Sequence, residues 1–139
     1  MASLLEDLRA QHRELVFRAG ELEACLAPGR VEADPAGVHR QLLNFGHLLH
    51  RHLDLEDRDF YPMAHQHPEA GPRVAGFEAG VGRLKATVDA FLMGWPDARS
   101  LAQDPAGFRD YAGAVLRVLA RRIAAEESEL FPLFEGPAA

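Results

Sequence analysis

Two residues spaced four apart, His52 and Glu56, have the right chemistry to share one metal ion. In a helix this spacing places the imidazole and the carboxylate on one face, with Cβ atoms about 5–6 Å apart. Both residues fall in the apolar stripe of their segment, where an ionised carboxylate is costly to bury unless a cation or hydrogen-bond donors compensate it. The pair therefore indicates a candidate buried metal site.

The chain repeats the carboxylate part of this pattern 70 residues later, at Glu126. Segments 56–62 and 126–132 share one order: glutamate, acidic residue, two variable residues, an apolar residue, an aromatic ring and proline. His12 lies on the apolar stripe of the first segment. A single inward-facing histidine is usually a core residue with satisfied hydrogen bonds, but the joint placement of these groups favours metal binding.

These elements are predicted to be four helices, because apolar residues recur at helical spacing and no segment alternates with the period of a strand. Proline and glycine pairs separate the segments, and Asp34-Pro35 and Asp104-Pro105 each supply an N-cap followed by proline at the first helical position. The expected helices cover 3–26, 35–62, 74–93 and 105–132. Pro62 is expected to kink or end the second helix, and 67–72 to be a connection.

His12, the run from His52 to Pro62, and the copy at 126–132 resemble the hemerythrin HHE cation-binding domain. The resemblance covers nearly the whole chain. It implies an all-α fold, an antiparallel up-down-up-down four-helix bundle, as a single domain over 1–139. It also implies a non-heme di-iron centre, with one histidine each from the first and third helices and a His-x-x-x-Glu pair from each of the other two. Both glutamates would bridge the irons.

The chain departs from that pattern in one half of the site. Arg122 stands 70 residues after His52, where the fourth helix should supply a histidine, and Val81 stands 69 residues after His12. The ligands of the family pattern that this chain keeps are His12, His52, Glu56 and Glu126. In the resemblance they form the complete protein ligand set for one metal ion. With nitrogen and oxygen ligands, such a mononuclear site suits iron, with manganese or zinc as alternatives.

Arg122 is predicted to replace the missing cation. A guanidinium stays protonated and holds a carboxylate with two hydrogen bonds, so Arg122 is expected to pair with Glu126 and to reach Glu56. The alternative is an arginine that extends to solvent from the edge of the stripe. Other histidines, at positions 47, 50, 65 and 67, are interpreted as a solvated or oligomer-contact surface rather than a second metal site.

The composition of the chain argues against two classes of partner, nucleic acids and anionic membranes. A net charge of −6 and a pI near 5.6 give no reason to expect nucleic acid or an anionic membrane, and Cys25, the single cysteine, cannot form an intrachain disulfide. The start of the chain lacks the pattern of a signal peptide and no apolar run is long enough to cross a bilayer, so a cytoplasmic protein is expected. The sequence leaves open a homo-oligomer or a protein partner.

Three functions fit these residues. The leading hypothesis is a non-enzymatic iron-binding domain that senses or stores iron, dioxygen or nitric oxide, with the metal ion or a small diatomic molecule as its ligand. The second is a non-heme iron enzyme acting on peroxide or nitric oxide. The third is a metal-free helical bundle that serves as an interaction module, with an Arg122–Glu126–Glu56 cluster in its core. Reversible dioxygen carriage in the hemerythrin manner needs two ferrous ions, which a one-metal site lacks.

Overall fold

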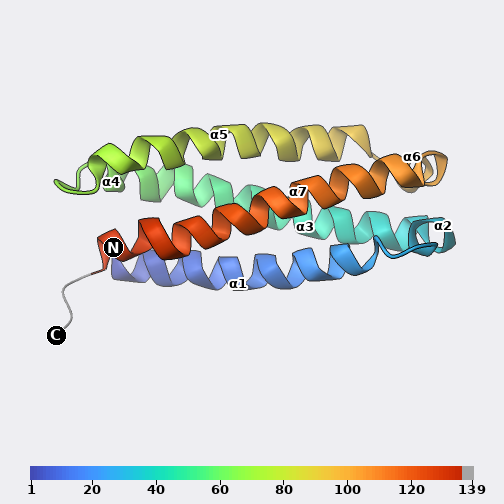
Figure 1. Ribbon diagram of the computed structural model, residues 1–139, viewed down its shortest axis with the longest axis horizontal. Helices are drawn as coiled ribbons and strands as arrows, with labels where there is room; N and C mark the ends of the chain where they lie inside the picture. The colour runs from blue at the N-terminus through green and yellow to red at the C-terminus, as the bar shows by residue number, and fades with distance from the viewer. Residues whose placement is uncertain (136–139) are drawn as a thin grey trace.

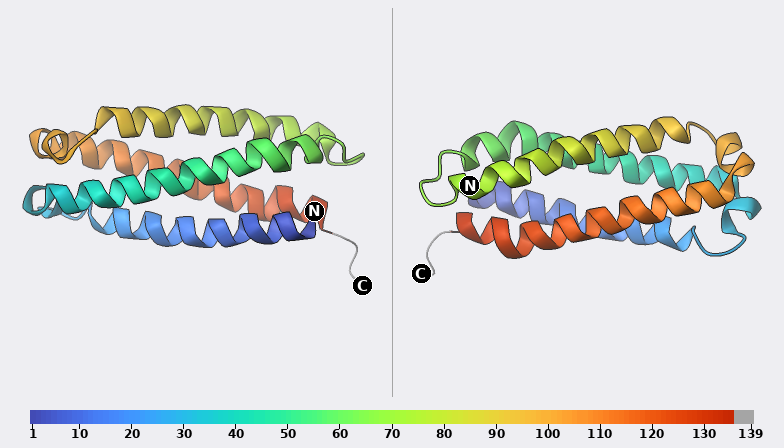
Figure 2. Two further views of the ribbon diagram at one scale, coloured as in Figure 1. Left: turned by 180° about the vertical axis from the view of Figure 1, so that it is seen from behind. Right: turned by 45° about the horizontal axis from the view of Figure 1, so that its top comes forward.

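The computed structural model describes residues 1–135, almost all of them in helices, and none of these residues forms a strand. Four long helices run along the molecule (Figure 1): α1 (Ala2–Ala24), α3 (Pro35–Leu55), α5 (Gly71–Gly94) and α7 (Pro105–Ala125). Consecutive long helices run in opposite directions, as the two views of Figure 2 show, and contacts join α1 to α3, α3 to α5, α5 to α7 and α7 to α1. The predicted antiparallel four-helix bundle is confirmed.

The second and fourth bundle helices begin as predicted, at Pro35 and Pro105. In each case the preceding aspartate caps the helix: Asp34 accepts a hydrogen bond from the N–H of Gly37, and Asp104 from that of Gly107, both at 3.0 Å. These bonds satisfy a backbone donor that the first turn of a helix leaves free, and proline has no such donor to lose there.

Two short helices were not predicted. They are α2 (Arg30–Ala33) and α6 (Ala98–Gln103), which contact each other at the end of the bundle where α1 meets α3 and α5 meets α7. The second is held by a capping box, in which Asp97 and Ser100 exchange side-chain and backbone hydrogen bonds. Segments this short carry too few apolar positions to show a helical period.

The predicted ends of the long helices need correction. The second bundle helix continues through a π-helical turn, η1 (Glu56–Phe60), into α4 (Tyr61–Ala64), and the fourth through η2 (Glu126–Leu130) into the 3-10 turn η3 (Phe131–Phe134). The third begins at residue 71 rather than 74, and the first ends at 24 rather than 26. Proline is tolerated in the first turn of a helix, so Pro62, Pro72 and Pro132 are helical rather than terminal.

The interior holds apolar side chains from all four long helices, with two clusters of aromatic rings. One cluster packs Phe60 edge-on against Phe131 and Phe134, next to the two π-helical turns. The other packs Phe91 and Phe108 against Trp95 near α6. Within the described residues no helix has the length and apolar character needed to span a membrane. The last four residues of the predicted domain, 136–139, lie outside the described part.

Candidate metal centre

Four polar side chains are buried in the middle of this apolar bundle, beside the first aromatic cluster. His12 comes from α1, His52 from α3, and Glu56 and Glu126 each begin a π-helical turn. Their exposed fractions are 2%, 1%, 0% and 1%, and within residues 1–135 they are the polar or charged residues of the buried core. All four were predicted from the sequence to face the interior, and all four are buried there.

The four side chains converge on one small volume. One ligand atom each from His12, His52 and Glu126 lies within 4.8 Å of the others. His12 Nε2 is 3.2 Å from Glu126 Oε1, and His52 Nε2 is 2.9 Å from Glu56 Oε1. This is the donor set, two imidazole nitrogens and two carboxylates, that first-row transition metals accept.

Three of these buried atoms lack a hydrogen bond within the described residues: His52 Nε2 and both oxygens of Glu56. His52 Nε2 and Glu56 Oε1 are therefore close to each other but do not have the geometry of a hydrogen bond. Buried polar atoms almost always have a partner, because an unpaired one loses its hydration without compensation. Lone pairs that converge in this way fit a cation at their common focus, so the residues present suit a metal ion.

Hydrogen bonds from outside the focus fix the orientation of both rings. His52 Nδ1 lies 2.7 Å from Gln11 Oε1, and His12 Nδ1 lies 2.7 Å from Glu127 Oε1. An amide or carboxylate oxygen only accepts, so each Nδ1 carries the proton, which leaves Nε2 of the same ring to face the focus. Partners of this kind hold the histidines of metal sites and raise their basicity as ligands.

Arg122 extends from α7 toward the same focus from the opposite side. Its Nη2 lies 3.4 Å from Glu126 Oε2 and 3.9 Å from Glu56 Oε2, and its side chain is 12% exposed. The same nitrogen donates to the Tyr61 hydroxyl at 2.9 Å and to the backbone oxygen of Phe77 at 3.0 Å. Tyr61 in turn donates to Glu126 Oε2 at 3.4 Å.

Each glutamate therefore presents its two oxygens to two different groups. Oε1 of Glu56 faces His52 and Oε1 of Glu126 faces His12, whereas both Oε2 atoms face the guanidinium of Arg122. The space between the carboxylates is thus divided into a histidine half and an arginine half. On α5 the residue that corresponds to His12 in the repeat is Val81, which is buried and offers no ligand atom.

The electrostatics of the cluster follow from burial and from the proximity of two carboxylates. Burial, followed by the charge of Glu56, raises the pKa of Glu126 to about 7. Burial alone would lower the pKa of His12, but its hydrogen bond to Glu126 and the charge of that carboxylate outweigh burial, and the pKa is raised. Burial, with His12 nearby, lowers the pKa of His52 to about 4. Burial and the charges of Glu56 and Glu126 raise the pKa of Tyr61.

Three contributors to the site were not assigned a role from the sequence: Gln11, Glu127 and the hydroxyl of Tyr61. Gln11 lies beside the apolar stripe, where a polar residue is ordinary, and the 69-residue offset aligns it with Gly80. Glu127 and Tyr61 belong to the two repeated motifs, where they correspond to Asp57 and Phe131. Their chemistry becomes visible only once the helices bring the motifs together.

The remaining histidines singled out in the sequence lie away from this focus. His50 is partly exposed and contacts Asp54 at 3.3 Å and Asp89 at 3.4 Å. His65 pairs with Glu78 at 2.9 Å, and His67 accepts a hydrogen bond from the backbone N–H of Ala70 and packs on Phe134. His47 is exposed. None of the four joins a group of three or more metal-ligating side chains within residues 1–135.

Residues 3–134 match the family model described as "Hemerythrin HHE cation binding domain", which spans nearly the whole chain. No curated protein and no solved structure matches the sequence.

Proposed function

The chain belongs to the hemerythrin HHE cation binding domain family, and from this premise we propose that its core binds a single metal ion, with iron as the first choice. The ligands are His12, His52, Glu56 and Glu126. Arg122 takes the place of a second ion. The expected cytoplasmic location and the choice of iron over manganese or zinc are part of the same proposal.

One observation carries this proposal: the division of both carboxylates between histidines and a guanidinium. A carboxylate that bridges two cations offers one oxygen to each, and here the second cation is the side chain of Arg122. Arginine keeps its proton at any working pH and cannot serve as an ordinary ligand. The charge on the arginine side is therefore permanent, and only the histidine side can bind a metal ion.

The chain's own residues prepare the histidine side for a metal. Gln11 and Glu127 set the ring orientation of His52 and His12, so that both Nε2 atoms face inward. Arg122 and Tyr61 hold Glu126 Oε2 away from the histidines. When bound, iron would supply Lewis acidity and one-electron redox chemistry, with coordination positions left for water or a small ligand.

We propose a binding or sensing role rather than dioxygen carriage. Carriage in the hemerythrin manner takes two electrons from two ferrous ions, and the arginine half holds no metal ligand set. A single buried iron site suits detection of iron itself, dioxygen or nitric oxide. An iron enzyme acting on peroxide or nitric oxide is the alternative, and turnover by the purified iron form separates it from a sensor.

Metal content per chain tests the proposal directly. Protein purified without chelator and loaded with ferrous iron under anaerobic conditions should retain one ion per chain, measured by elemental analysis. Retention of two core-bound ions, or of none, would refute it, and the second result would favour the metal-free interaction module.

Two substitutions locate the ion. His52→Gln should abolish retention, whereas His47→Gln, on the exposed face of the same helix, should leave one ion per chain.

Gln11→Leu removes only the partner of His52 Nδ1 and should weaken iron affinity by about 10–100-fold, the usual effect of losing such a partner. Equal affinities in Gln11→Leu and the unmodified chain would contradict the assigned orientation of His52.

A further inference from the structure

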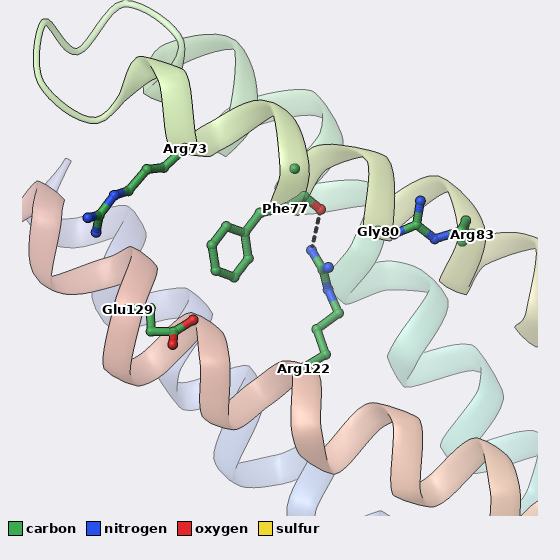
Figure 3. A pocket seen from close by; sticks show the side chains of 7 residues that line it. Arg73, Phe77, Gly80, Arg83, Arg122 and Glu129 are labelled. Atoms are coloured by element: carbon green, nitrogen blue, oxygen red, sulfur yellow. Dashed lines mark hydrogen bonds between the residues drawn. The ribbon is translucent and has the colours of Figure 1, made fainter.

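A cavity of about 560 Å³ opens on the outer side of Arg122, between α5 and the helix formed by α7 and η2. Its walls combine cations, one aromatic ring and two glycines. In the close-up of Figure 3, Arg73 and Glu129 lie on one side of the Phe77 ring and Arg122 on the other. The residues that line it are Arg73, Gly76, Phe77, Gly80, Arg83, Arg122 and Glu129.

Two guanidinium groups meet at one point of this cavity, the exposed side of Gly80. A Cβ atom built on Gly80 would overlap Arg122 Nη1 and would lie 3.9 Å from Arg83 Nη2. Within residues 1–135 neither Arg122 Nη1 nor the Arg83 side chain donates a hydrogen bond, because all bonds of Arg122 are made by Nη2. Two like charges with free donors that face the same spot are suited to hold an anion between them.

The charge balance of the cavity favours a single negative charge on that anion. The charge of Arg122 is already shared with the buried glutamates, and the carboxylate of Glu129 in the same cavity offsets one of the other two arginines. Close to one positive charge is left over. A dianion such as phosphate would be repelled by Glu129 without gaining a second free cation.

The rest of the cavity is suited to an apolar group. The Phe77 ring projects into it, and Gly76, which precedes Phe77 on α5, adds no side chain to the wall. Nothing lies within 4 Å of a Cβ atom built on Gly76. This volume is much larger than a carboxylate needs, so a ligand that also packs against the ring fits better than a simple inorganic ion.

We propose that this cavity binds a small monocarboxylate with an aromatic or branched apolar body. The carboxylate lies at Gly80, where Arg83 Nη2 and Arg122 Nη1 donate to its two oxygens, and the apolar body packs on Phe77 over Gly76. The site needs no metal. Failure of this proposal would therefore leave the proposed metal-binding function untouched, and the reverse also holds.

Benzoate is a suitable probe, with benzyl alcohol as its uncharged analogue and inorganic phosphate as the dianion. Calorimetric titration of metal-free protein at neutral pH and low ionic strength should give saturable benzoate binding with a dissociation constant on the order of 1 mM or below, as two charge-assisted hydrogen bonds and ring packing allow. Benzyl alcohol should bind at least about tenfold more weakly because it lacks the charge, and phosphate because it is repelled by Glu129 and has no apolar group to pack on Phe77.

Two matched pairs of variants test the placement. Arg83→Gln should weaken benzoate binding by about tenfold or more, whereas Arg51→Gln, an exposed arginine of α3, should not change it. Gly76→Leu should weaken benzoate binding by about tenfold or more, because the new side chain occupies the part of the wall on which the apolar body packs. Gly82→Leu adds the same side chain to the same helix, also with nothing within 4 Å of its Cβ, and should leave binding intact.

The proposal is overturned if benzoate shows no saturable binding, or if benzyl alcohol or phosphate binds as tightly as benzoate. It is also overturned if Arg83→Gln or Gly76→Leu leaves the dissociation constant unchanged. Circular dichroism of each variant checks that a loss of binding is not a loss of fold.

Discussion

The guanidinium of Arg122 is the side chain that sets this core apart from a symmetric pair of metal sites. Its Nη2 is close to both buried carboxylates and donates to Tyr61 and to the backbone of α5. Every one of these contacts is at least partly shielded from water, so the charges of Arg122 and the glutamates compensate each other strongly. A surface ion pair would contribute much less.

Arg122→Ala should therefore destabilise metal-free protein by about 3–5 kcal/mol, the usual result of leaving a buried charge without its partner. The loss should be largest above neutral pH. Arg122 lowers the pKa of Glu126, so the variant raises that pKa further, and the folded state can then take up a proton and regain stability as the pH falls through it. Urea unfolding at acidic and alkaline pH measures both effects.

Arg121→Ala is the matched control, because the exposed neighbour Arg121 bonds only to the backbone oxygen of Arg117 among the described residues. Its effect should stay within about 0.5 kcal/mol, as for most surface changes. A loss of similar size in Arg122→Ala would mean that Arg122 acts as a solvated side chain at the edge of the stripe.

The protonation of Glu126 predicts that the affinity of the site for a metal ion depends on pH. Because its pKa is raised to about 7, metal-free protein holds a proton that a metal ion must displace. Zinc affinity, chosen to avoid redox chemistry and measured by competition with a chelator, should be about tenfold or more higher at pH 8 than at pH 6. His12, whose pKa is also raised, acts in the same direction. Equal affinities at the two pH values would exclude a buried proton at the site.

Single residues of the candidate site were predictable where they interrupt an apolar stripe. His12, His52 and Glu56 stood out because polar groups at core positions are costly, and Arg122 because the 70-residue offset paired it with a histidine. Gln11 gave no such signal, since it lies beside the stripe at a position that polar residues ordinarily occupy. Its role depends on the angle between α1 and α3, which no local pattern contains.

At the scale of elements, α5 differs most from its counterpart α1. It supplies a backbone oxygen, that of Phe77, and a bare backbone at Gly80 where α1 supplies His12 and Gln11. A glycine in the middle of a helix is ordinarily unfavourable, by about 0.8–1.0 kcal/mol relative to alanine. At position 80 the missing side chain makes room for Arg122.

Gly80→Ala should consequently lack the stabilisation that the same change gives elsewhere on α5. Gly82→Ala, with open space around its Cβ, should raise the free energy of unfolding by up to about 1 kcal/mol. Gly80→Ala should raise it less, or lower it, because its Cβ displaces Arg122 Nη1. Combined with Arg122→Ala, the change at position 80 should regain the full effect, as a double-mutant cycle would show. Equal gains in both single variants would mean that Arg122 does not need the glycine.

The four long helices were predictable because their apolar residues repeat over many turns, and their proline-marked starts were predictable from local capping chemistry. The π-helical turns were not. Each begins at a core glutamate. Its extra residue lets the backbone N–H groups of Tyr61 and Phe131 donate to the backbone oxygens of Glu56 and Glu126, five residues back. Such turns are frequent at functional sites, but the apolar period is too coarse to reveal a single additional residue.

The whole molecule is a repeat of two helical hairpins whose symmetry is broken at one place. Four pairs of corresponding residues differ around the site, and in each pair the residue that serves the histidine side has no equivalent on the arginine side: His52 and Arg122, His12 and Val81, Gln11 and Gly80, and Glu127 and Asp57. Asp57 has no imidazole to hold and binds Lys85 at 3.0 Å instead. Ligands and their supporting groups are thus absent as a set on the arginine side, where the Arg122 guanidinium supplies the positive charge beside Oε2 of both carboxylates.

Restoring that set should restore a second metal ion. The double change Val81→His and Arg122→His should raise iron content from at most one to two per chain and produce the oxo-to-iron charge-transfer absorption expected of a diferric centre of this family. Either change alone should do less, since it leaves the second ion one histidine short.

Adding Gly80→Gln should strengthen the second site. Histidine is shorter than the arginine it replaces at position 122, so the space above Gly80 becomes free. A glutamine there can accept from Nδ1 of the new imidazole as Gln11 accepts from His52. Affinity for the second ion should rise by about 10–100-fold over the double variant, measured by anaerobic titration with ferrous iron. A single iron in the triple variant would show that restoring the side chains at positions 80, 81 and 122 is not sufficient, and that the arrangement of α5 and α7 excludes the second metal.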